Sequence, residues 1–167
     1  FLTYCNHGLR MTKNPFLIHL SDEEATLDFA GALVGAIPKV CIIALYGQLG
    51  AGKTTLVRGL LKSMGYEGSV KSPTYGLVET YEIHGQTIHH FDLYRLNNTK
   101  ELEAIGMRDY FHEAICLVEW AEKGNNYLPK ADLDCYIDMA PDGRVIRLSA
   151  NTMTGKKILM DLEKHVQ

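Results

Sequence analysis

The chain has 167 residues, of which 46% are apolar and 22% are charged, and its formal net charge is −3. This length suits one domain, and the composition excludes a disordered, collagen-like or disulfide-stapled chain. A stand-alone nucleic-acid binder is not expected, because neutralising phosphates needs clustered Lys and Arg. No apolar run approaches the roughly 18 residues of a membrane-spanning helix. We therefore expect a soluble protein that does not enter a membrane.

The four cysteines contain no C-x-x-C pair: Cys5, Cys41, Cys116 and Cys135. The last three lie in apolar runs typical of strands, where a free thiol behaves as a small buried hydrophobic group. This usage favours a reducing, cytoplasmic compartment over a secreted disulfide framework. Residues 1–10 lack a signal-peptide pattern, and residues 1–14 are expected to form a flexible leader before a single domain that spans residues 15–167.

The first half of the chain alternates between helix and strand signals. Residues 21–24 have the spacing of a capping box with Ser21 as N-cap, and the apolar stripe after them predicts a helix that ends before Pro38. An unbroken apolar run over residues 40–46 predicts a strand buried on both faces, as in a parallel sheet. Helical periodicity then returns over residues 54–64.

The second half predicts two hairpins around a further buried strand. Residues 75–83 and 87–93 predict a first hairpin across a short turn that contains Gly. An apolar run over residues 114–118 predicts the buried strand. The other expected elements are helical segments from residue 98 and over 107–111, a hairpin of strands 133–139 and 145–148, and a closing helix over 156–166.

Residues 47–54 read GQLGAGKT and match the phosphate-loop motif G-x-x-x-x-G-K-S/T. Glycines let backbone N–H groups approach phosphate oxygens closely. Lys53 supplies positive charge to the β- and γ-phosphates, the Thr54 hydroxyl is suited to Mg²⁺, and the next helix directs its N-terminus at the anion. The expected strand before the loop and helix after it favour a nucleoside triphosphate site over a Gly-rich turn with an incidental Lys.

A phosphate-loop protein needs a second anionic group near Mg²⁺, usually at the end of a neighbouring parallel strand. Glu119 directly follows the apolar run over residues 114–118 and is the best candidate. The alternative is a strand-end acid that faces solvent. Trp120, the only tryptophan, fits core packing and a partner surface equally well.

Two more segments are rich in polar groups. Ser72, Thr74 and Tyr75 follow the phosphate-loop helix, either as a switch-like loop near the γ-phosphate or as a plain turn. Asp92 near a strand end is suited to order water near the phosphate, or to pair with Arg95 at the surface.

The adjacent histidines His89 and His90 do not predict a metal site. Neighbouring residues on a strand point to opposite faces of the sheet, so these two rings cannot bind one ion together.

Four segments occur together in one order: GQLGAGKTT at 47–55, SPTY at 72–75, HFDLYR at 90–95 and LVEW at 117–120. With ELE at 101–103 and GMRDYF at 106–111, they resemble the bacterial TsaE (YjeE) family over roughly residues 20–140. A phosphate loop alone is unspecific, whereas the ordered set is specific.

The resemblance implies an α/β fold, a P-loop NTPase-like three-layer sandwich with a mixed sheet and an antiparallel hairpin portion. It implies ATP or ADP and Mg²⁺ as cofactors, and it implies TsaD and TsaB as partners. Those partners attach the threonylcarbamoyl group to adenosine 37 of tRNAs that decode ANN codons. Family members are weak ATPases alone, and their nucleotide cycle supports turnover by the partner complex, which holds the tRNA.

The resemblance also implies roles for single residues. Lys53, Asp92 and Glu119 would be catalytic, with Asp92 positioning water. Thr54 and Glu119 would hold Mg²⁺. The phosphates would be bound by loop residues Gly50, Ala51, Gly52, Lys53, Thr54 and Thr55.

Two further groups follow from the family likeness. Ser72, Thr74 and Tyr75 would belong to a switch-like loop. Glu23 or Thr26, in the first helix, would contact the nucleotide.

The sequence departs from the family pattern at two positions. Gln48 stands where the family usually has Asp, and Gly76 stands where it usually has Thr or Ser. Position 48 is free in the phosphate-loop pattern, so phosphate binding should persist, although Gln48 cannot make an acidic contact to metal-bound water or a partner. Gly76 removes a side chain from the loop after Tyr75.

Three alternatives compete with an ATPase of this family. A small-molecule kinase shares the phosphate loop but should also have an Arg-rich lid, which the sequence does not show. A GTPase should have an N-K-x-D motif, which is absent. A nucleotide-dependent binding module without turnover of its own overlaps with a partner-activated ATPase.

Overall fold

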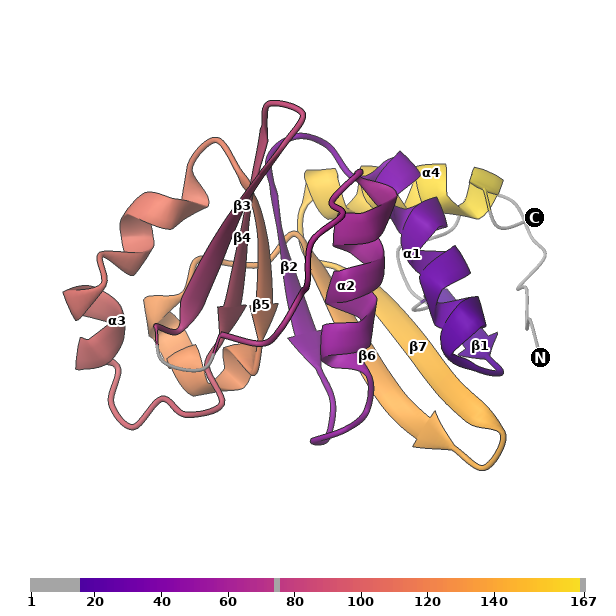
Figure 1. Ribbon diagram of the computed structural model, residues 1–167, viewed down its shortest axis with the longest axis horizontal. Helices are drawn as coiled ribbons and strands as arrows, with labels where there is room; N and C mark the ends of the chain where they lie inside the picture. Colours follow the sequence, from indigo (N-terminus) through magenta and orange to yellow (C-terminus); the bar gives the residue numbers. More distant parts are fainter. Residues whose placement is uncertain (1–15, 74–75, 166–167) are drawn as a thin grey trace.

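The computed structural model describes residues 16–73 and 76–165. Within these residues a seven-stranded sheet has the order β1-β7-β6-β2-β5-β4-β3 (Figure 1). Its four central strands, β6, β2, β5 and β4, run parallel, and β1, β7 and β3 run antiparallel to their neighbours. The strands are β1 (Phe16–Leu20), β2 (Cys41–Tyr46), β3 (Val78–Ile83), β4 (Gln86–Asp92), β5 (Ile115–Glu119), β6 (Leu133–Ala140) and β7 (Gly143–Ala150).

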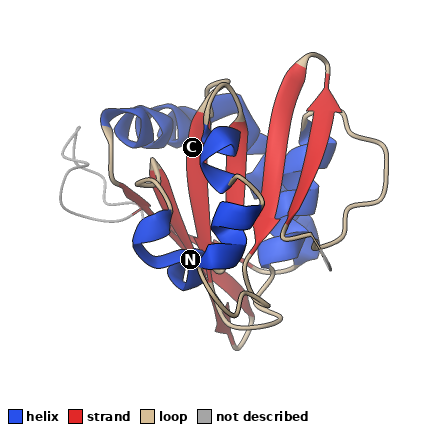
Figure 2. Ribbon diagram, turned by 90° about the vertical axis from the view of Figure 1, so that its left-hand side faces the viewer, coloured by secondary structure: helices blue, strands red, loops and turns tan. Residues whose placement is uncertain are grey.

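Helical segments cover both faces of this sheet (Figures 1 and 2). The helices α1 (Glu23–Ala36), α2 (Lys53–Ser63) and α4 (Met153–His165) share one apolar cluster with one face of the strands. The short helix α3 (Lys100–Ala104) and the 3₁₀ segments η1 (Met107–Phe111) and η2 (Ala121–Tyr127) contribute to a second cluster on the other face. These three layers and the mixed sheet confirm the predicted fold class.

The carboxyl ends of the central parallel strands meet at one edge of the sheet. In Figure 1 the arrowheads of β2, β4 and β5 point to the lower edge, where α2 begins. Asp92 is the register partner of Glu119 at the ends of β4 and β5. Strand β2 is apolar toward both helical layers, since Ile43 and Leu45 belong to one cluster and Ala44 to the other. The parallel pairing therefore brings the phosphate loop and both acids to the same edge.

Several predicted element boundaries are wrong, among them both ends of β7, which spans Gly143–Ala150 and not 145–148. The N-cap of α1 is Asp22 and not Ser21, because the Asp22 carboxylate accepts the Ala25 N–H at 2.8 Å. Strand β3 begins at Val78 and not at residue 75, since Leu77 has a φ of 62°, which breaks the extended backbone. The closing helix begins at Met153, three residues earlier than predicted, because Thr152 accepts the Gly155 N–H at 3.1 Å and thereby caps it.

Strand β1 was not predicted from the sequence. It has five residues and, among the described residues, lies at the edge of the sheet and pairs only with β7. Such a short edge strand carries a weak alternating signal, and its partner lies more than a hundred residues away. The leader predicted for residues 1–14 falls outside the described residues.

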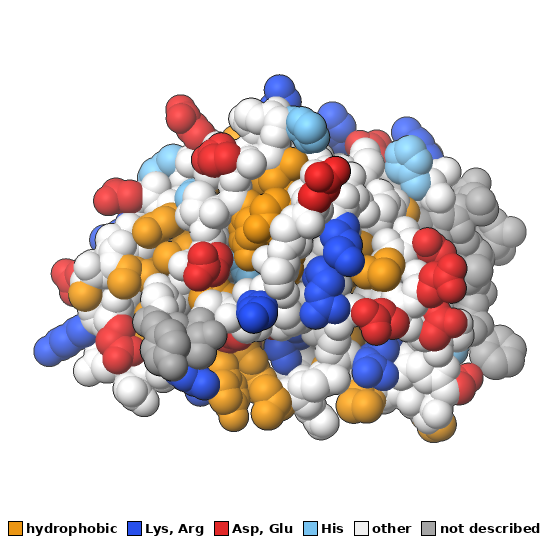
Figure 3. All heavy atoms as spheres, in the orientation of Figure 1, with side chains coloured by type: hydrophobic (Ala, Val, Ile, Leu, Met, Phe, Trp, Pro, Cys, Tyr) orange, Lys and Arg blue, Asp and Glu red, His pale blue; other side chains and the backbone are white. Residues whose placement is uncertain are grey.

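The cysteines Cys41, Cys116 and Cys135 are free and buried, as the sequence predicts. Burial in the sheet raises the pKa of Cys41 and of Cys116 to about 12. Figure 3 shows basic side chains over α2 and acidic side chains over α1, so this face carries charges of both signs. Among the described residues, no helix combines the length and the apolar character needed to cross a bilayer.

Candidate functional site

The phosphate loop connects β2 to α2 and needs glycine at its first and sixth positions. A Cβ atom on Gly47 would lie 2.6 Å from the Ile137 carbonyl oxygen of β6. Gly52 precedes α2 with a φ of 113°, a conformation that side chains disfavour. The loop therefore packs tightly against β6 while its backbone turns into the first turn of α2.

Lys53 lies beneath the loop rather than in solvent. Its side chain donates to the carbonyl oxygens of Gly47 at 2.5 Å and Gln48 at 2.9 Å. The ammonium also lies 4.3 Å from the ring centroid of Trp120. Desolvation lowers the pKa of Lys53, and the nearby carboxylates, Glu119 first, oppose that shift. Trp120 is half-buried and lines the site. It therefore lies neither fully in the core nor fully on the surface.

Thr54, Ser72 and Glu119 meet beside Lys53. The Thr54 hydroxyl lies 2.8 Å from the Ser72 hydroxyl and donates to the Glu119 carboxylate oxygens at 3.1 and 3.2 Å. Glu119 is 2% exposed, so it is not an acid that faces solvent. Three elements that are distant in sequence thus bring two hydroxyls and a carboxylate together.

This donor set fits Mg²⁺. Mg²⁺ prefers hard oxygen ligands and is commonly held by one or two carboxylates together with water and substrate phosphates. The Thr54 hydroxyl and the Glu119 carboxylate supply such oxygens within contact distance of each other. In the part of the chain that the structure describes, no group of three or more His, Cys, Asp or Glu side chains forms an all-protein metal cage.

His90 belongs to this site although the sequence analysis set it aside. Its Nε2 lies 2.6 Å from Oε2 of Glu119, and the ring is fully buried. His89 points to the other face, as predicted, where its ring packs on Tyr110. A usable signal was present in the sequence: His90 precedes Asp92 by two residues, so both lie on one face of β4.

Asp92 lines the same cavity as the groups above. Its Oδ1 accepts the Tyr94 N–H at 3.0 Å. The cavity measures about 200 Å³, and its walls include Lys53, Thr54, Ser72, Asp92 and Glu119. We call it the phosphate cavity.

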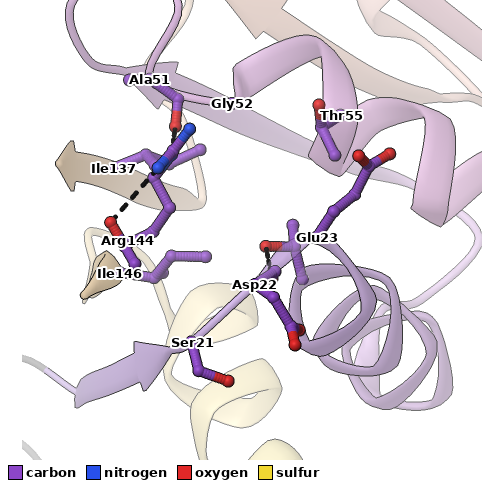
Figure 4. A pocket seen from close by; sticks show the side chains of 11 residues that line it. Ser21, Asp22, Glu23, Ala51, Gly52, Thr55, Ile137, Arg144 and Ile146 are labelled. Atoms are coloured by element: carbon purple, nitrogen blue, oxygen red, sulfur yellow. Dashed lines mark hydrogen bonds between the residues drawn. The ribbon is translucent and has the colours of Figure 1, made fainter. Parts of the chain in front are cut away.

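A second cavity of about 120 Å³ lies beside the phosphate loop (Figure 4). Its walls include Glu23 and Thr26 of α1, Gly52 and Thr55, and Arg144 of β7. We call it the nucleoside-side cavity, after the role that is proposed for it below.

Arg144 connects that cavity to the loop. Its Nε donates to the Ala51 carbonyl oxygen at 2.6 Å, and Figure 4 shows its guanidinium turned toward Ala51. Sequence reasoning missed Arg144, since no motif marks it. Glu23 forms an ion pair with Arg58 at 3.5 Å, and the Thr26 hydroxyl donates to the Asp22 carbonyl.

The family model for threonylcarbamoyl adenosine biosynthesis protein TsaE matches residues 20–148. The chain belongs to the TsaE family. TsaE of Haemophilus influenzae is 55% identical over 122 residues, which cover 72% of this chain and 77% of that protein. TsaE of Bacillus subtilis is 34% identical over 126 residues, which cover 74% of this chain and 78% of that protein.

A solved structure supports the fold of this TsaE family member. The crystal structure of Bacillus subtilis YdiB superposes with a TM-score of 0.76 at 25% identity and covers 92% of this chain and 97% of that chain.

The sequence-predicted residues of this family member fall into two places. The phosphate cavity gathers all of the predicted catalytic and metal-binding residues, Lys53, Thr54, Asp92 and Glu119. It also contains Gly50, Gly52 and Thr55 of the predicted phosphate-binding set and Ser72 of the predicted switch-like loop. Glu23, Thr26 and Ala51 line the nucleoside-side cavity, which shares Gly52 and Thr55. Thr74 and Tyr75 lie outside the described residues.

Proposed function

We propose that this chain is a Mg²⁺-dependent ATP hydrolase that works with TsaB and TsaD. Its nucleotide cycle would support formation of threonylcarbamoyladenosine at position 37 of tRNAs that read ANN codons. The observation that carries the proposal is the convergence of Lys53, Thr54, Asp92 and Glu119 on one cavity at the carboxyl edge of the sheet. Membership of the TsaE family supplies the pathway.

The roles follow from the positions of these groups. Lys53 would exchange the carbonyl oxygens of Gly47 and Gln48 for the β- and γ-phosphates of ATP. Thr54 and Glu119 would hold Mg²⁺, which when bound neutralises charge on the phosphates. Asp92 would orient the water that attacks the γ-phosphorus, and Lys53 would offset the charge that develops on the leaving ADP.

The nucleoside-side cavity suits the ribose and base of the same ATP. It opens on the other side of the phosphate loop and carries both the Glu23 carboxylate and the Arg144 guanidinium. Groups that accept and donate hydrogen bonds are thus available to a nucleoside.

Dependence on partners is consistent with the contacts of the free chain. Lys53, Thr54 and Glu119 are paired with protein groups in this structure, so binding and turnover require these contacts to rearrange. A partner that favours the rearranged state would raise the rate of hydrolysis. The net charge of −3 also supports a subunit that leaves tRNA binding to its partners.

The test is ATP hydrolysis by the chain alone, with purified TsaB and TsaD, and with these proteins plus tRNA. We expect little phosphate release alone, faster release with the partners, and threonylcarbamoyladenosine only when tRNA and an activated threonylcarbamoyl donor are also supplied. Glu119→Gln should abolish the partner-stimulated rate. Unchanged hydrolysis in the presence of the partners, together with phosphorylation of a small metabolite, would establish the kinase alternative instead.

A further inference from the structure

His90 contacts the candidate metal ligand but does not line the phosphate cavity. Oε2 of Glu119 lies 2.6 Å from His90 Nε2 of β4 and 3.2 Å from the Thr54 hydroxyl of α2. Oε1 of Glu119 accepts from Thr54 at 3.1 Å. One carboxylate thus joins β4, β5 and α2, and the side chains of His90 and Glu119 are 0% and 2% exposed.

A carboxylate this deeply buried needs hydrogen-bond donors, because desolvation of its charge is costly. In the free chain Thr54 donates to Glu119, and His90 Nε2 lies within hydrogen-bond distance of it. Under the proposed function, Thr54 directs its oxygen to Mg²⁺, so its hydroxyl proton no longer holds Glu119 in the same way. The contact from His90 lies away from the phosphate cavity and can persist when metal is bound.

The surroundings of His90 argue against a purely packing role. Two neighbours of His90 are buried hydrophobic residues. Ile88 lies two residues earlier on the same face of β4, and Leu117 is the register partner of His90 on β5. An apolar residue would fit such a position, yet it holds an imidazole. Among the described residues, His90 Nδ1 is buried without a hydrogen-bond partner, which is a cost that an aliphatic side chain would avoid.

We propose that His90 is a positioning residue that donates from Nε2 to Oε2 of Glu119 and thereby holds Oε1 toward Thr54 and Mg²⁺. An ionised carboxylate can accept hydrogen bonds but cannot donate them, so in this contact the ring proton belongs on Nε2. Carboxylate ligands of metals are generally fixed by such outer hydrogen bonds, and their loss lowers metal affinity or activity about 10- to 100-fold. This inference rests on the proposed function, because it requires Glu119 to bind metal.

The test compares two amide variants of His90. In His90→Gln the amide nitrogen reaches the region of Nε2, whereas in His90→Asn it stops near Nδ1. His89→Gln is the matched control, because His89 lies on the opposite face of β4 and bonds to Thr80. ADP affinity is measured by calorimetry in EDTA and in Mg²⁺, and thermal unfolding is recorded for each variant.

We expect all variants to bind ADP within about twofold of wild type in EDTA, since the phosphate loop is intact. The gain in affinity on adding Mg²⁺ should fall about 10- to 100-fold in His90→Asn. His90→Gln should recover most of this gain, and His89→Gln should equal wild type.

The outcomes separate the two proposals. If wild type binds ADP without any gain from Mg²⁺, the proposed function fails and the role of His90 fails with it. If wild type shows the gain and His90→Asn keeps it, only the role of His90 is wrong. Equal losses in His90→Gln and His90→Asn, or unfolding of both, would show that the site needs the imidazole for packing, which also overturns the inference.

Discussion

The two cavities on either side of the phosphate loop are built differently. In the phosphate cavity Thr54 hydrogen-bonds to Ser72 and Glu119, and Glu119 also contacts His90 behind the cavity. Lys53 and Asp92 in the same cavity contact backbone groups. In the nucleoside-side cavity Arg144 and Thr26 hydrogen-bond to backbone carbonyl groups.

This difference predicts how each cavity responds to substitution. Removing Glu119 leaves the buried His90 and the Thr54 hydroxyl without this partner, so function and stability should change together. Removing a side chain from the nucleoside-side cavity leaves a backbone carbonyl of Ala51 or Asp22, residues that line this cavity, or breaks the partly exposed pair of Glu23 and Arg58. There we expect weaker binding with little loss of stability.

The largest effect is expected for Lys53→Ala. This variant removes the buried cation that would stabilise the transferring phosphoryl group, and such a loss lowers kcat by roughly 100- to 1000-fold. The measurement is partner-stimulated ATP hydrolysis at saturating ATP, together with ADP affinity. Lys62→Ala is the control, because Lys62 lies in the last turn of the same helix and is exposed. Hydrolysis by Lys53→Ala near the wild-type rate would contradict the role of this residue.

The phosphate cavity could largely be predicted because its parts lie at the ends of recognisable elements. The loop motif gave Lys53 and Thr54, and the end of an apolar run gave Glu119. His90 was not predicted, since its contact depends on the register of β4 against β5, which places it diagonally across from Glu119. The same register of β4 and β5 places Asp92 next to Glu119. Neither motif alone predicts that the two acids are neighbours.

The nucleoside-side cavity was much less predictable from the residues themselves. Glu23 and Thr26 were inferred from family likeness alone, and Arg144 was not inferred at all. Arg144 reaches Ala51 because β7 pairs with β6 and β6 pairs with β2, a route through three strands that no local pattern encodes. Edge strand β1, which leads into α1, was missed for the same reason.

A smaller effect is expected for Arg144→Ala. Loss of this guanidinium should lower ADP affinity about tenfold, the equivalent of one charged hydrogen bond of about 1.4 kcal/mol. Affinity for inorganic pyrophosphate should stay within about twofold, because the phosphate cavity is not lined by Arg144. Calorimetry with both ligands measures the difference, and Arg144→Lys separates charge from the planar donor. Equal losses of affinity for ADP and for pyrophosphate would instead show that Arg144 acts on the phosphates. The two cavities would then not have separate roles.

The smallest effect concerns buried thiols that neither cavity uses. Burial raises the pKa of Cys41 and Cys116 from 9.0 to about 12, so the folded state favours the neutral thiol. Their contribution to stability is complete below pH 9 and is lost as the pH rises from 9 toward 12, because only the unfolded chain ionises there. Urea unfolding at pH 8 and pH 10 should show this loss, and Cys116→Ala should reduce it. An identical decline in Cys116→Ala and wild type would show that other groups cause the alkaline loss of stability. The buried Lys53 is not such a group, because its lowered pKa makes stability rise with pH.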